Sequence, residues 1–111
     1  MGGIQEKARI DALYDIIITS EAQTGLLSIS RQNRRVVADA IDDLAFDPRP
    51  STSKLLVKAE NLRRLTVGDY RVIYGIEESI QTVTVELVRH RGIVYTLLTV
   101  LKTTVKSKYS K

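Results

Sequence analysis

The chain has 111 residues, of which 43% are hydrophobic and 27% charged, with a formal net charge of +4 and a pI near 9.5. This length suits one domain with a single modest core. Because there is no cysteine and only one histidine, His90, disulfides and thiolate metal sites are excluded, and we expect no metal or other cofactor. No stretch reaches the roughly 20 apolar residues of a membrane span. The N-terminus lacks the apolar region of a signal peptide, so we expect a cytoplasmic protein. The positive net charge favours polyanionic partners.

The first quarter of the chain predicts an extension, a strand and a short helix. Residues 1–13 show no strong period, and we interpret them as an N-terminal extension. Residues 15–19 form a β-branched run that indicates a buried strand. Ser20 is the expected N-cap of a helix through Leu26, with Glu21 in its first turn.

A second, longer helix is predicted from Ser30 to Phe46. Pro48 and Pro50 end it. Three arginines at its start could bind a partner, but an ordinary solvated face is the favoured interpretation. Its apolar residues form one helical stripe: Val36, Val37, Ala40, Ile41, Leu44 and Ala45.

The second half predicts three consecutive antiparallel strands. Residues 50–61 are a polar connection, and residues 62–67 and 70–74 are two β-rich runs joined by the turn-forming pair Gly68-Asp69. A third run covers residues 82–88. Residues 96–101 fit a helix or a strand equally well, and residues 102–111 form a basic tail. We therefore expect one domain at 14–101.

The expected fold class is α+β, with an N-terminal strand and two helices packed on one face of a small antiparallel sheet. The other face is expected to be open and rimmed by arginines. Because side chains alternate along a strand, Arg64 lies on the face opposite Leu65, and Arg71 on the face opposite Tyr70 and Val72. The strand register, which decides whether Arg64 and Arg71 meet, is not fixed by the sequence.

Two interpretations of the late arginines remain open. They could pair with nearby acids on an ordinary surface, namely Asp69, Glu77, Glu78 or Glu86. Alternatively, several arginines on one small sheet repel each other unless an anion binds between them. The arginines concerned are Arg64, Arg71, Arg89 and Arg91.

The segment from Leu62 to Tyr74, with Arg89-His90-Arg91 and Tyr95 beyond it, resembles the RelE/ParE toxin superfamily, and its RelE branch in particular. The resemblance spans roughly residues 14–95 and implies the microbial-RNase-like RelE fold. It also implies a toxin that enters the ribosomal A site and cleaves mRNA there without a metal. Its expected partners are the ribosome, mRNA and a cognate antitoxin, with which it would form a hetero-oligomer.

The resemblance also assigns candidate roles to residues. Some relatives carry lysine at the position of Arg64, and a further basic residue where this chain has Leu62 or Thr66. The candidate catalytic residues are Arg64, Arg71, Arg91 and Tyr95. The candidate substrate-binding residues are Lys54, Lys58, Arg63, Arg89 and His90.

The chemistry of RNA cleavage by a 2′-hydroxyl suits these residue types. Negative charge builds on the phosphate oxygens and the leaving 5′ oxygen, and preorganised arginines stabilise it. Since arginine stays protonated, it is a poor base. The proton acceptor is left open among Tyr95, His90, Lys54, Lys58 and no protein group at all. Tyr95 could instead stack on a nucleobase of the RNA.

Two other functions remain in competition. A ParE-like toxin would inhibit DNA gyrase without catalysis of its own. A decayed relative would survive only as a binding module that represses transcription with its antitoxin.

Overall fold

The computed structural model describes residues 13–56 and 61–93. Its elements in chain order are β1 (Asp15–Ile18), α2 (Ser20–Leu27), α3 (Arg31–Asp43), β2 (Ser53–Leu55), β3 (Leu62–Val67), β4 (Tyr70–Glu77), the 3-10 turn η1 (Glu78–Ile80) and β5 (Thr82–His90). The predicted extension, the basic tail and the 96–101 segment lie outside the described residues. No helix within the described ranges is long and apolar enough to cross a membrane.

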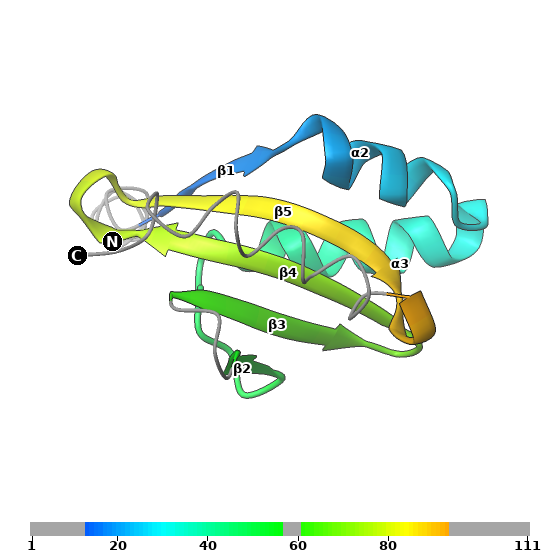
Figure 1. The fold of residues 1–111 in the computed structure, drawn as a ribbon. Coiled ribbons are helices and arrows are strands. Elements are labelled where there is room, and N and C mark those ends of the chain that lie inside the picture. The colour runs from blue at the N-terminus through cyan, green and yellow to red at the C-terminus, as the bar shows by residue number, and fades with distance from the viewer. Residues whose placement is uncertain (1–12, 57–60, 94–111) are drawn as a thin grey trace, which may run out of the picture.

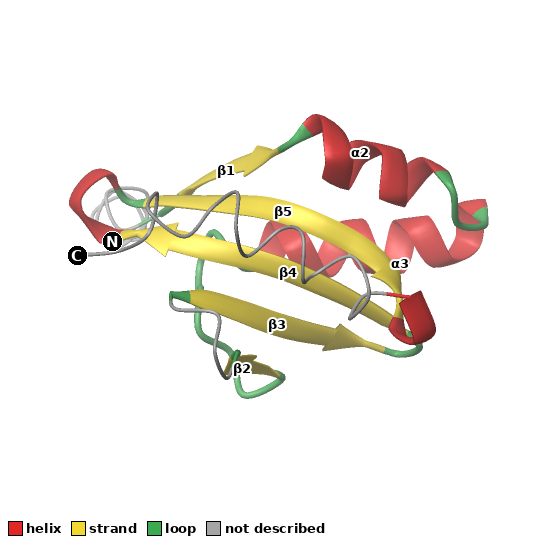
Figure 2. Ribbon diagram, viewed as in Figure 1, coloured by secondary structure: helices red, strands yellow, loops and turns green. Residues whose placement is uncertain are grey.

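The strands form one mixed sheet in the order β1-β5-β4-β3-β2 (Figure 1). The β3-β4-β5 meander is antiparallel, as predicted, and β1 joins β5 in parallel. Helices α2 and α3 both lie on one face of this sheet (Figure 2). The predicted α+β class and the helix placement are therefore confirmed.

The core lies between the helices and the sheet. Val37 and Ile41 of α3 and its C-cap Leu44 pack against strand residues that alternate toward the helices, because every second side chain of a strand points to the same face. The predicted helical stripe is correct except for Val36, which is 55% exposed. On the sheet side, the buried members of this core are Leu65, Val72, Tyr74, Val83, Val85 and Val88.

Four sequence expectations are corrected by the structure. Among the described strands β1 lies at the edge of the sheet and pairs with β5 alone, and Ile17 is half exposed, so the expectation of a buried strand is wrong. The N-cap of α2 is Thr19, one residue before the predicted Ser20. The polar connection contains a short strand, β2, because its backbone pairs with β3. The sheet face away from the helices is not open throughout, since apolar side chains are buried there: Leu62, Ile73 and Leu87.

Candidate nucleic-acid interface

Strand register brings four basic positions together on the sheet face turned away from the helices. Lys54 of β2 lies directly across from Arg64 of β3, and Arg71 of β4 lies directly across from Arg89 of β5. Arg64 pairs with Ile73 and Thr66 pairs with Arg71, so Arg64 and Arg71 are diagonal neighbours. Diagonal neighbours have Cβ atoms within about 7–8 Å. We call these four positions, Lys54, Arg64, Arg71 and Arg89, the cationic face.

The β3–β4 turn forms one end of this face. Val67 pairs with Tyr70, which leaves a two-residue turn, and Gly68 occupies its first position with φ of +59°. Glycine adopts this backbone conformation without steric cost, so the turn fixes the register that places the cations. Like charges directly opposite each other on a sheet are destabilising. An anion bound between them would offset that repulsion.

Arg71 lies against its own turn. Its Nη1 donates to the carbonyl oxygens of Gly68 and Tyr70, both at 2.9 Å. These contacts hold the guanidinium at the end of the hairpin.

Arg91 lies in the short helical turn that follows β5, and this turn is tied to the same hairpin. Its backbone N–H donates to the Asp69 carbonyl at 2.8 Å, and its Nε lies 3.8 Å from Asp69 Oδ1. Both side chains are more than 60% exposed, so the pair is a weak one. Two candidate cations, Arg71 and Arg91, therefore each contact the β3–β4 turn.

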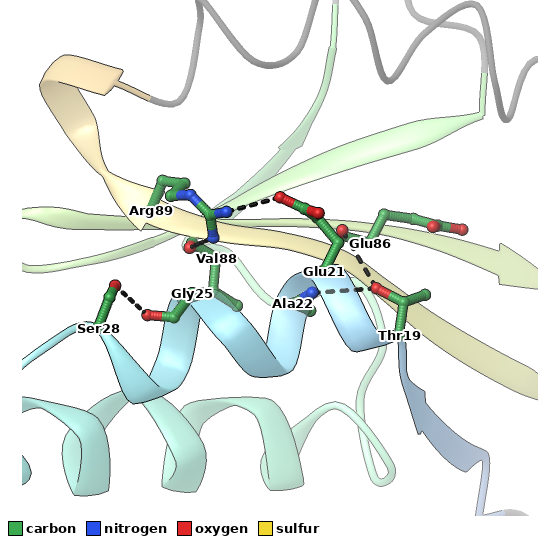
Figure 3. A network of polar contacts seen from close by, with 8 residues as sticks. All are labelled: Thr19, Glu21, Ala22, Gly25, Ser28, Glu86, Val88 and Arg89. Atoms are coloured by element: carbon green, nitrogen blue, oxygen red, sulfur yellow. Dashed lines mark hydrogen bonds and ion pairs between the residues drawn. The ribbon is translucent and has the colours of Figure 1, made fainter.

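The side chain of Arg89 points toward helix α2, although its backbone pairs with that of Arg71 (Figure 3). Its Nη2 donates to Glu21 Oε2 at 2.6 Å, and its Nη1 donates to its own Val88 carbonyl at 2.7 Å. The side chain is only 16% exposed. Glu21 was not among the acids considered as arginine partners, because it lies 68 residues away in the sequence. Only the packing of α2 against β5 brings the two together.

Arg63 and His90 lie on the helix side of the sheet. Arg63 donates from Nε to Ser53 Oγ at 3.0 Å, which ties β3 to β2. His90 pairs with Tyr70 across the strands, and the two rings meet edge to face with centroids 5.7 Å apart. His90 Nδ1 also accepts a hydrogen bond from the Gly92 N–H. Alternation correctly placed His90 opposite Arg89, and both Arg63 and His90 are separated from the cationic face by the sheet.

A cavity of about 300 Å³ opens on that helix side. It is lined by both polar and apolar residues, and none of the cationic-face residues lines it. Within the described ranges, no group of three or more acids or histidines is placed to hold a metal ion. The cavity is lined by Asn33, Val36, Val37, Val67, Gly68, Asp69, Tyr70 and His90.

Two predicted site residues, Lys58 and Tyr95, lie outside the described residues. The structure adds two features that sequence reasoning missed. One is the direct opposition of Lys54 and Arg64, which depends on β2. The apolar pair Leu55-Leu56 directly after Lys54 was the available signal for that strand. The other is the contact of Arg89 with Glu21, for which local sequence carries no signal.

Comparison with known proteins agrees with this architecture. The model of the family described as ParE toxin of type II toxin-antitoxin system, parDE, matches residues 16–95. A search of curated proteins found no match.

Solved structures of similar fold are RelE toxins. The archaeal RelE-RelB complex from Pyrococcus horikoshii OT3 matches with a TM-score of 0.64 and 25% identity, over 72% of this chain and 97% of that chain. The toxin-antitoxin complex RelBE2 from Mycobacterium tuberculosis matches with a TM-score of 0.65 and 24% identity, over 72% and 93%. The isolated E. coli RelE toxin matches with a TM-score of 0.60 and 18% identity, over 78% and 95%. The family match and the shared fold agree, and this chain belongs to the ParE toxin family of type II toxin-antitoxin systems, within the RelE/ParE superfamily.

Proposed function

We propose that this toxin is a ribosome-dependent mRNA endonuclease that cleaves in the A site. The observation that carries the proposal is the cationic face, where Lys54 stands directly across from Arg64 and Arg71 lies diagonal to Arg64. Such an arrangement suits a phosphodiester, which would offset the repulsion between the cations.

The proposed reaction is attack of the 2′-hydroxyl on the adjacent phosphate. The O2′–P bond forms while the P–O5′ bond breaks, giving a 2′,3′-cyclic phosphate and a 5′-hydroxyl. Arg71 and Arg91 both contact the β3–β4 turn and would stabilise charge on the phosphate oxygens. Arg64, diagonal to Arg71, would extend that clamp along the backbone. Tyr95 is the candidate for proton transfer or base stacking.

Lys54 is the candidate on the same face for holding a flanking phosphate, together with Lys58 from the neighbouring connection. Arg89, the third candidate, is held by Glu21 and would bind a phosphate on this face when released from that contact. Arg63 and His90 are better suited to supporting the sheet from the helix side, because their contacts are to Ser53 and Tyr70. We also propose that an antitoxin binds this chain in a hetero-oligomer. Support comes from the similar RelE structures that were solved as complexes with RelB.

A second candidate function is inhibition of DNA gyrase without catalysis. The family model that matches is that of ParE, which favours this alternative. The presence of Arg64, Arg71, Arg91 and Tyr95 together favours the nuclease, because a toxin that binds gyrase without catalysis does not require these four residues.

One experiment separates the two functions. Purified toxin is added to ribosomes stalled on a defined mRNA, and new 5′ ends are mapped beside the same mRNA without ribosomes. Cleavage at the A-site codon only with ribosomes is the expected result. No cleavage, combined with inhibition of DNA supercoiling by gyrase, would favour the ParE-like function.

A further inference from the structure

The side chain of Arg89 leaves the cationic face although its backbone position belongs to it. Its Cα lies directly across from that of Arg71, yet its guanidinium lies against α2 at the outer edge of β5 (Figure 3). β1 pairs with β5 only as far as Val85, so it does not reach this part of the edge. The Val88 carbonyl there accepts its hydrogen bond from Arg89 instead.

Helix α2 shapes the place that the guanidinium occupies. Gly25 packs so closely on β5 that an added Cβ would overlap the Val88 carbonyl oxygen and Nη1 of Arg89. Glu21, one turn earlier on the helix, closes the other side with its carboxylate. The Arg89 side chain is 16% exposed, whereas that of Glu21 is 58% exposed. The cation is thus sheltered, while the acid that holds it faces solvent.

We propose that Glu21 is a positioning residue for RNA binding, which holds Arg89 at the edge of β5 and so keeps it out of the cationic face. A carboxylate and a phosphate compete for the same guanidinium, because both accept the same paired hydrogen bonds. While Glu21 holds Arg89, RNA meets one positive charge fewer on this face. The ion pair is partly exposed and therefore weak enough for a phosphate that approaches Arg71 to compete with it.

This inference rests on the proposed function only in requiring that the cationic face binds RNA. It does not depend on cleavage or on the ribosome. A toxin that binds RNA on the cationic face but never cleaves it would retain this inference and lose the proposed function.

The test is the salt dependence of RNA binding by the intact chain. Binding of a fluorescein-labelled single-stranded RNA oligonucleotide is followed by anisotropy over a series of NaCl concentrations. Glu21→Gln releases Arg89 to contact phosphate, so the slope of log K against log salt should become steeper by about 0.7, the value of one additional contact. Binding at low salt should tighten by about two- to fivefold, because a partly exposed ion pair no longer competes.

Two further variants make the result specific. Glu78→Gln removes the same charge from the Arg49–Glu78 pair at η1, so it should leave the slope unchanged. In the double variant Glu21→Gln with Arg89→Gln, the added slope should disappear. Circular dichroism melts of each variant verify that the fold is retained.

Several outcomes would overturn the inference. An unchanged or shallower slope for Glu21→Gln would mean that Arg89 acts from the place where Glu21 holds it. An equal change in slope for Glu21→Gln and Glu78→Gln would mean that the effect comes from the net charge of the protein and not from Arg89. Absence of RNA binding by all of the proteins would mean that the cationic face does not bind phosphate.

Discussion

Thr19 shows how one residue can cap a helix and anchor it to the sheet. Its Oγ1 accepts a hydrogen bond from the Ala22 N–H at 3.1 Å and donates to the Glu86 carbonyl at 3.3 Å. The sequence favoured Ser20, because serine and threonine are both good N-caps and the two are adjacent. The choice between them depends on where β1 ends, which is a tertiary property.

This assignment predicts different costs for two adjacent substitutions. Thr19→Ala should lower the free energy of unfolding by about 1–2 kcal/mol, because an N-cap and a contact to β5 are both lost. Ser20→Ala should change it by less than about 0.5 kcal/mol, because Ser20 is exposed at the first helical position. Urea unfolding followed by circular dichroism measures both. Equal effects would contradict the assignment of Thr19 as the cap.

Tyr74 gives a prediction about pH. Its hydroxyl donates to the Pro48 carbonyl at 2.6 Å, and burial raises its pKa above the ordinary value of 10.0. The unfolded chain therefore loses this proton at a lower pH than the folded chain. The contribution of Tyr74 to stability is complete below pH 10 and declines as pH rises from there through the raised folded pKa.

Tyr74→Phe tests whether the contribution of Tyr74 to stability declines as pH rises. Near neutral pH the variant should be less stable by about 1 kcal/mol, because the buried hydrogen bond is lost. As pH rises above the ordinary value of 10.0, the difference between the two proteins should shrink, since phenylalanine has no proton to lose. Urea unfolding across this pH range gives the comparison, and a difference that stays constant would contradict the raised pKa.

At the scale of elements, the approach of α2 to β5 is the most demanding contact. Gly25 is buried, and an added Cβ would overlap the Val88 carbonyl, which is backbone and cannot move away locally. Gly25→Ala gains about 1 kcal/mol of helix propensity, but overpacking costs roughly 1–3 kcal/mol. We therefore expect a net loss of stability in chemical denaturation, of about 1 kcal/mol.

The neighbouring substitution Thr24→Ala is the matched control. Thr24 is exposed on the same helix, so alanine should stabilise the protein by up to about 0.7 kcal/mol through propensity alone. We expect the free energy of unfolding to fall for Gly25→Ala and to rise for Thr24→Ala, although the two residues are adjacent in one helix. A stabilising Gly25→Ala would show that α2 does not pack on β5 in this way.

The elements themselves were largely predictable because their patterns are local. The stripe of α3, the turn at Gly68-Asp69 and the alternation along β3 and β4 all depend on neighbours in sequence. β2 was missed because it has three residues and owes its strand form to pairing with β3. The burial of Ile73 on the second face was missed because alternation identifies two faces without saying which of them is covered.

At the scale of the whole molecule, the sequence proposes the residues of the candidate site but does not carry their geometry. Alternation placed Arg64 and Arg71 each opposite the apolar residues of its own strand, and left open whether the two meet. Their diagonal relation, and the opposition of Arg71 to Arg89, depend on register. The contact of Arg89 with Glu21 depends on long-range packing, so no local pattern could have revealed it.

The central claim is that arginines at the β3–β4 turn act on mRNA in the ribosome. The measurement that tests it most directly is the rate of A-site cleavage by Arg71→Ala and Arg91→Ala, with Arg35→Ala as the control. Arg35 is an exposed arginine of α3, on the helix side, so its loss removes equal charge away from the proposed site. Loss of a preorganised donor to the reacting phosphate should slow cleavage by about 100-fold or more. Arg35→Ala should cleave at the wild-type rate. Wild-type rates in Arg71→Ala and Arg91→Ala, with their folds intact, would contradict the account.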